Sequence, residues 1–164
     1  MRRSTAALGS TAFLLLAPGT VAVLVPWLLT RWQRGADLGA LRLVGWLLVV
    51  LGGVGLVHAF VRFVRQGFGT PAPVAPPAHL VVTGAYRYVR NPMYLAVLAT
   101  IVGQALILGR LVLVGYAVLA FVVMWAFVTF YEEPSLRRRF GAEYDAYRVA
   151  VPGWVPRLRR PPSR

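Results

Sequence analysis

The stretch TGAYRYVRNPMY, residues 83–94, places two arginines, three tyrosines and an Asn-Pro pair immediately before a long apolar segment. A second apolar segment follows, and it ends at two adjacent acids, Glu132 and Glu133. Polar side chains of several kinds are thus concentrated where the apolar segments begin and end. The pattern predicts a site that works at the membrane surface, and not an anchor alone.

The composition is typical of an integral membrane protein. Of the 164 residues, 58% are hydrophobic and 14% are charged. The chain has no cysteine, two histidines and five acids, which argues against disulfides, thiolate chemistry and a metal site. The net charge of +13 comes from 18 arginines, without any lysine. Because these arginines flank apolar segments, we expect them to contact membrane lipids with anionic headgroups, and we expect no nucleic-acid partner.

Four uncharged windows are long enough to cross a bilayer, which requires about 20 helical residues. They are residues 4–30, residues 43–61, the stretch between Pro92 and Arg110, and residues 111–131. The first is longer than the apolar core of a signal peptide and has no clear cleavage site, so we expect a retained helix. The predicted fold is all-α and integral to the membrane, with four transmembrane helices in two antiparallel hairpins.

An amphipathic helix on the cytoplasmic surface is expected after the fourth span. Pro134 is expected to end the transmembrane helix. Apolar and aromatic residues then recur at helical spacing, at Leu136, Phe140, Tyr144 and Tyr147. This spacing predicts a surface helix that packs on the bundle.

The distribution of arginine predicts the orientation. With four spans, the N-terminus, the central loop and the C-terminal tail lie on one side, which holds fourteen of the arginines against four on the other. The positive-inside rule therefore places both termini and the central loop in the cytoplasm of a multi-pass cell-membrane protein.

Four segments are expected along the chain: an N-terminal transmembrane hairpin (1–66), a Pro-rich cytoplasmic connector (67–82), a unit with the polar motif, the second hairpin and the surface helix (83–156), and a flexible Arg/Pro tail (157–164). The connector is either a simple linker or a strap across the cytoplasmic face. In the N-terminal hairpin, small residues suit close helix packing. They are Gly45, Gly52, Gly53 and Gly55.

The short connection at residues 108–110 forces the third and fourth spans into an antiparallel hairpin. The start of the third span and the end of the fourth must therefore lie side by side at one membrane surface. Pro92 suits the first turn of a helix, with Asn91 as the N-cap, and free N–H groups there favour an anionic ligand group.

Each polar residue of this region has a plain alternative role. Arg87 and Arg90 can grip a carboxylate or phosphate, or anchor to lipid headgroups. Tyr86, Tyr88 and Tyr94 can form an interfacial aromatic belt. Glu132 and Glu133 repel each other and oppose the helix dipole, so they require a compensating partner. That partner is either a cationic ligand or an arginine that forms a structural salt bridge, namely Arg87, Arg90 or Arg137.

These motifs, in this order, resemble the isoprenylcysteine carboxyl methyltransferase and phospholipid methyltransferase superfamily over about residues 71–156. The resemblance is carried by residues 83–94, Glu132-Glu133-x-x-Leu136, Phe140-Gly141, Tyr144-x-x-Tyr147 and the Val-Pro-x-x-x-Pro ending. It implies an integral-membrane methyltransferase that uses S-adenosylmethionine without a Rossmann domain, and the chain indeed has no G-x-G-x-x-G loop after a strand. Position 91 carries Asn where isoprenylcysteine enzymes usually have His.

The resemblance implies that residues 83–94 and the acid pair form a cofactor-binding site for S-adenosylmethionine. The residues expected to line it are Tyr86, Arg87, Arg90, Asn91, Pro92, Tyr94, Glu132 and Glu133. The expected reaction is methyl transfer at the cytoplasmic membrane face to the carboxyl, amine or thiol of a lipophilic small molecule or lipid. No catalytic residue is assigned. The alternative is a non-catalytic scaffold or assembly protein of the same fold.

Overall fold

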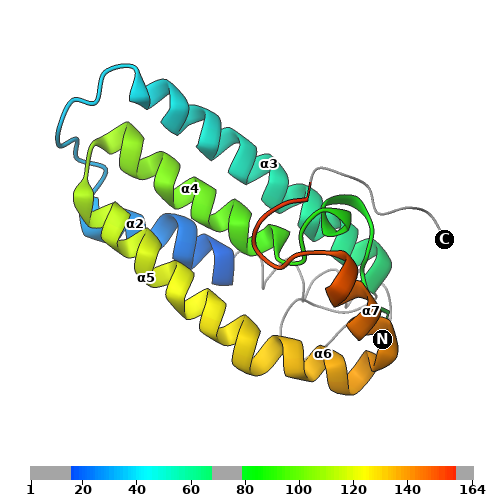
Figure 1. Cartoon of the computed structure of the whole chain (residues 1–164). Coiled ribbons are helices and arrows are strands. Elements are labelled where there is room, and N and C mark those ends of the chain that lie inside the picture. Colours follow the sequence, from blue (N-terminus) through cyan, green and yellow to red (C-terminus); the bar gives the residue numbers. More distant parts are fainter. Residues whose placement is uncertain (1–15, 68–78, 158–164) are drawn as a thin grey trace.

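The computed structural model describes residues 16–67 and 79–157. The start of the first predicted span, most of the Pro-rich connector and most of the Arg/Pro tail lie outside the described residues. Within the described part the protein is all-helical, with five continuous helices and one short 3-10 turn (Figure 1).

The first continuous helix runs over 16–30 and contains a π-helical turn, η1 (Thr20–Leu24), followed by α2 (Val25–Thr30). The second is α3 (Leu41–Gly67), and the 3-10 turn η2 (Gly84–Arg87) leads into α4 (Pro92–Leu108). The next helix comprises α5 (Leu111–Phe127), the π-helical turn η3 (Val128–Glu132) and α6 (Glu133–Phe140) without interruption. The last is α7 (Ala142–Ala150).

Two of these helices are long and apolar enough to cross a membrane, over Leu41–Ala59 and within Leu111–Phe140. The described part of the first helix and α4 are apolar but shorter. Large aliphatic side chains are exposed along both long helices, such as Val50 and Val54 on α3 and Val118 and Val122 on α5. Apolar surface on this scale suits contact with lipid chains.

Small residues bring the backbones of α3 and α4 into direct contact. A Cβ atom on Gly45 would lie 2.7 Å from the carbonyl oxygen of Gly103, and one on Gly52 would lie 2.7 Å from that of Ala96. The prediction of close packing is confirmed for these two glycines. Gly53 has no atom within 4 Å of an added Cβ, so it does not serve this contact.

Replacing Gly45 with alanine should destabilise the bundle by about 1–3 kcal/mol, because the methyl group meets backbone that cannot move aside. Gly53→Ala is the matched control, since both changes raise helix propensity and only one introduces a clash. Thermal unfolding in detergent should show a lower midpoint for Gly45→Ala than for Gly53→Ala. Equal midpoints would show that α3 and α4 are not held this closely.

The predicted hairpin of α4 and α5 is confirmed. Gly109 joins the two helices with a left-handed backbone (φ 62°), a conformation that glycine adopts without strain. The loop after α2 is fastened to this turn, because Gly35 N–H donates to Leu108 O and Ala36 N–H donates to Gly109 O. Figure 1 shows this loop and the α4–α5 turn at one end of the bundle, with η2, α6 and α7 at the other.

A π-helical turn precedes the proline in each interrupted helix. Pro26 lies two residues after η1, and Pro134 lies two residues after η3. A proline lacks an N–H group and its ring meets the carbonyl four residues earlier, so a widened turn lets the helix continue. The prediction that Pro134 ends the helix is therefore wrong, since the helix continues to Phe140.

Two carbonyl groups in the π-helical turn before Pro26 accept hydrogen bonds from the neighbouring helices. Gln104 of α4 donates to Ala22 O at 2.7 Å, and Tyr116 of α5 donates to Val21 O at 2.8 Å. Around these bonds lies the main buried apolar cluster, whose members are Ala22, Val97, Ile101, Ala117 and Ala120. The first helix is thereby held against both α4 and α5.

The prediction of a single C-terminal surface helix is also wrong in detail, because the structure has two helices there. Its first half, α6, continues the α5 helix, and Gly141 (φ 51°, ψ −125°) breaks the chain before α7. Glycine permits that backbone conformation, which turns α7 back toward the bundle. Tyr144 of α7 is 2% exposed, so this helix does pack on the rest of the protein.

Candidate functional site

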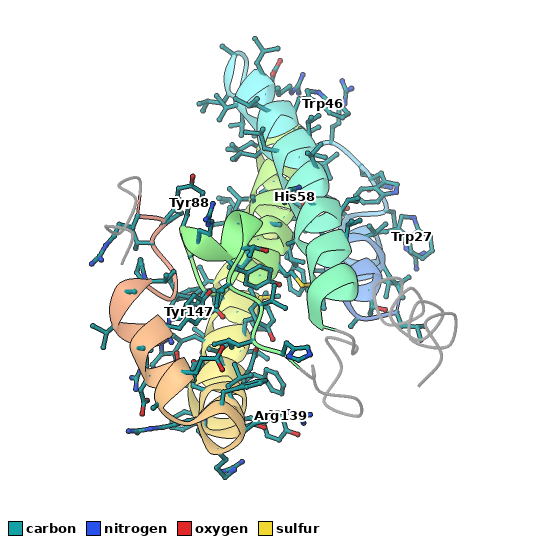
Figure 2. The ribbon with its side chains drawn as sticks, turned by 90° about the vertical axis from the view of Figure 1, so that its right-hand side faces the viewer. Trp27, Trp46, His58, Tyr88, Arg139 and Tyr147 are labelled. Carbon is teal, nitrogen blue, oxygen red and sulfur yellow. The ribbon has the colours of Figure 1, made fainter. Side chains whose placement is uncertain are left out.

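Most of the predicted site residues are brought together by the α4–α5 hairpin and by α7. The start of α4 and the α5–α6 junction lie at the same end of the bundle, as the short connection requires (Figure 1). Figure 2 shows Tyr147 of α7 beside the η2 segment, and its hydroxyl donates to Tyr86 O at 2.7 Å. Burial raises the pKa of Tyr147 above its usual value, so this donor stays protonated.

Glu133 is neutralised within the protein. Arg90 Nη1 lies 2.8 Å from Glu133 Oε1, and both side chains are largely buried, with 13% and 19% exposure. Arg148 Nε lies 3.6 Å from the other carboxylate oxygen. Arg90 Nη1 also donates to Tyr144 Oη at 3.1 Å. The structural salt bridge considered for the acid pair therefore exists for Glu133, with Arg90 as its main partner.

Glu132 lies in a different environment. Tyr94 Oη donates to Glu132 Oε2 at 2.9 Å, and no cation among the described residues forms an ion pair with this carboxylate. Burial raises the pKa of the Tyr86 phenol, and the nearby Glu132 carboxylate raises it further. Glu132 is thus a partly buried carboxylate close to two tyrosines, and no cation among the described residues pairs with it.

Asn91 and Pro92 occupy the positions predicted for them. Pro92 is the first residue of α4, and Asn91 is the N-cap residue, but its side chain makes no capping hydrogen bond. Asn91 is 7% exposed, and its Nδ2 is buried without a hydrogen-bond partner among the described residues. A buried amide donor without a partner is costly, so Nδ2 is available to a ligand.

Arg87 is not brought to the acid pair. Its side chain is exposed, and it forms no ion pair within the described part of the chain. Tyr88 is 39% exposed, as an interfacial aromatic residue would be. A role for Arg87 in cofactor binding stays a prediction.

The C-terminal segment 151–157, beyond α7, is a part of the site that sequence reasoning missed. It runs along the residues before α4, where Arg90 N–H donates to Pro152 O at 2.9 Å and Arg157 N–H donates to Tyr88 O at 2.9 Å. Asn91 N–H donates to Gly153 O at 3.3 Å. The Val-Pro-x-x-x-Pro ending signals an ordered extended segment, but it does not indicate the partner.

The fold suits a membrane protein, because it has two apolar helices of spanning length, and two adjacent carboxylates lie close to tyrosines and an arginine at one end of its bundle. A family model described as phospholipid methyltransferase matches residues 38–143, which is more than half of the sequence. The chain therefore belongs to the phospholipid methyltransferase family. The resemblance noted in the sequence is confirmed, and the matched range contains every predicted site residue. No curated protein and no solved structure gave a match.

Proposed function

We propose that the protein is an S-adenosylmethionine-dependent methyltransferase that acts at the cytoplasmic membrane face on a lipophilic small molecule or lipid. Family membership supports methyl transfer. The excess of arginine in the N-terminus, the central loop and the C-terminal tail of the sequence supports the cytoplasmic placement of both termini. The acceptor group is a carboxyl, an amine or a thiol.

The observation that carries this proposal is the unequal environment of the two adjacent acids. Glu133 is held by Arg90 at 2.8 Å, whereas Glu132 has a tyrosine hydroxyl as its hydrogen-bond partner. A partly buried carboxylate without a counter-ion suits a cationic ligand. The ammonium group of S-adenosylmethionine supplies that cation, so we assign ammonium binding to Glu132 and a structural role to Glu133.

The start of α4 fits the carboxylate of the same ligand. The first N–H groups of a helix lack partners within it, and the helix dipole favours an anion there. The Nδ2 of Asn91, which has no hydrogen-bond partner among the described residues, is an independent donor at this position. Arg90 adds positive charge, although its Nη1 is already engaged by Glu133 and Tyr144.

The cofactor supplies a methyl group on a positively charged sulfur, ready for displacement by a nucleophile. Tyr94 donates to Glu132 and Tyr86 is close enough to be affected by its charge, so both tyrosines lie near the proposed ammonium site, where an aromatic ring can stabilise a cation. The remaining tasks of the chain are alignment of donor and acceptor and exclusion of water. An acceptor that carries a proton also needs a base, which we leave unassigned.

A labelling experiment tests the proposed activity whatever the chemical identity of the acceptor. Purified protein is reconstituted in vesicles made from the total lipid of the source cells and given S-adenosylmethionine with an isotopically labelled methyl group. We expect a labelled lipophilic product that forms only with protein present, in step with S-adenosylhomocysteine. A folded protein that yields neither product would favour the scaffold alternative. Glu132→Gln serves as the comparison with weakened cofactor binding.

A further inference from the structure

The C-terminal segment 151–157 lies against the residues that precede α4, and its Gly153 is close to the side chains of Arg90 and Asn91. A Cβ atom at this position would come within 3.2 Å of Arg90 Nη2 and 3.6 Å of Asn91 Nδ2. Together with the backbone hydrogen bonds from Arg90 and Asn91, this close approach fixes the position of the next residue, Trp154.

Trp154 contacts one aromatic ring on each helix of the α4–α5 hairpin. Its ring centroid lies 6.2 Å from that of Tyr94, in a tilted arrangement, and 5.2 Å from that of Phe121, edge to face. Both distances are typical of aromatic pairs that attract each other. Tyr94 is the residue whose hydroxyl donates to Glu132, so Trp154 packs on a residue of the proposed cofactor site.

Phe121 belongs to the outward-facing side of α5. Its neighbours at helical spacing are also exposed: Val114 (48%), Val118 (60%) and Trp125 (43%), with Phe121 itself at 39%. The buried side of α5 is adjacent: Ala117 lies one turn before Phe121, with Leu113 and Ala120 beside it. Through Phe121, Trp154 therefore contacts the edge of the α5 surface that suits lipid chains.

We propose that Trp154 is a specificity-determining residue that stands between the cofactor site and the lipid-facing side of α5, and that it limits which apolar chain of a membrane-resident acceptor reaches the methyl donor. The inference rests on the proposed function. The exposed Phe121 contacts Trp154, and Trp154 in turn contacts Tyr94. Tyr94 then donates a hydrogen bond to Glu132. An acceptor that carries its reactive group toward Glu132 and its apolar chain toward lipid would have to pass this indole ring.

The first arm of the test measures whether Trp154 contacts lipid. Protein in vesicles of phosphatidylcholine is compared with protein in the same lipid brominated on its acyl chains, because bromine quenches tryptophan emission on contact. The emission lost on replacing Trp154 with Phe is the Trp154 signal. We expect brominated lipid to quench this signal and S-adenosylhomocysteine to change it. A signal that responds to neither probe would overturn the proposal.

The second arm measures selectivity in the labelling experiment with S-adenosylmethionine. Trp154→Ala should change the ratio of long-chain to short-chain labelled products by about tenfold, the effect expected from altering an apolar pocket. Trp125→Ala is the matched control, because Trp125 is exposed on the same side of α5 and contacts Phe130 instead of Tyr94. Equal product profiles for wild type and Trp154→Ala would contradict the proposal.

The two arms separate this inference from the proposed function. Calorimetric binding of S-adenosylhomocysteine to the wild-type protein reports on the cofactor site alone. Absence of binding together with lipid quenching of Trp154 would reject the cofactor assignment. If S-adenosylhomocysteine binds, but brominated lipid does not quench Trp154 and Trp154→Ala leaves the product profile unchanged, the role of Trp154 is rejected. The methyltransferase proposal then stands.

Discussion

Glu132→Gln should weaken binding of S-adenosylmethionine by about 30-fold or more, which corresponds to about 2 kcal/mol. The substitution keeps the size of the side chain and removes the one charge of the acid pair that the described residues leave uncompensated. Isothermal titration of the purified protein measures the change in Kd. The thermal unfolding midpoint should stay near that of the wild type, because no internal ion pair is lost.

Glu143→Gln is the control for this experiment. Glu143 is an exposed acid in the first turn of α7, so its removal changes the net charge by the same amount. We expect the Kd of this variant to match the wild type. If Glu132→Gln also bound S-adenosylmethionine normally, the assignment of the ammonium site to Glu132 would be wrong.

Arg90→Gln should destabilise the protein by about 3 kcal/mol, the order expected when one partner of a buried ion pair is removed. Glu133, with 19% exposure, would keep only the longer contact to Arg148 at 3.6 Å. The hydrogen bond from Arg90 to Tyr144, which holds α7 against this end of the bundle, would be lost as well. The unfolding midpoint in detergent measures the effect.

Two further variants test whether the effect of Arg90→Gln comes from the lost ion pair. Arg138→Gln removes an exposed arginine from α6 and should leave the midpoint nearly unchanged. Combining Arg90→Gln with Glu133→Gln should recover part of the lost stability, because no unpaired carboxylate then remains. A double variant as unstable as the sum of its single changes would show that the two side chains do not interact.

The sequence was sufficient to predict the hairpin of α4 and α5 and the proximity of its ends. The short connection around Gly109 leaves the two helices no other arrangement, so the meeting of Tyr94 with Glu132 followed from topology. The close packing at Gly45 and Gly52 was equally predictable, because small residues in an apolar helix suit backbone contact.

Other features depend on three-dimensional contacts that no local pattern reports. A proline normally ends a helix, and the π-helical turn before Pro134 allows the helix to continue into α6. Glu132 and Glu133 look equivalent in sequence, and their difference arises from which side chain reaches Arg90. The position of Trp154 depends on backbone pairing with residues far away along the chain.

The central claim is that Glu132 binds the ammonium group of the cofactor and Glu133 does not. An experimental structure of the protein with S-adenosylhomocysteine tests it most directly, because this product keeps the same amino and carboxylate groups. We predict the amino group within hydrogen-bond distance of the Glu132 carboxylate, with the Arg90–Glu133 ion pair intact. An amino group bound to Glu133, with Arg90 displaced from it, would contradict the account.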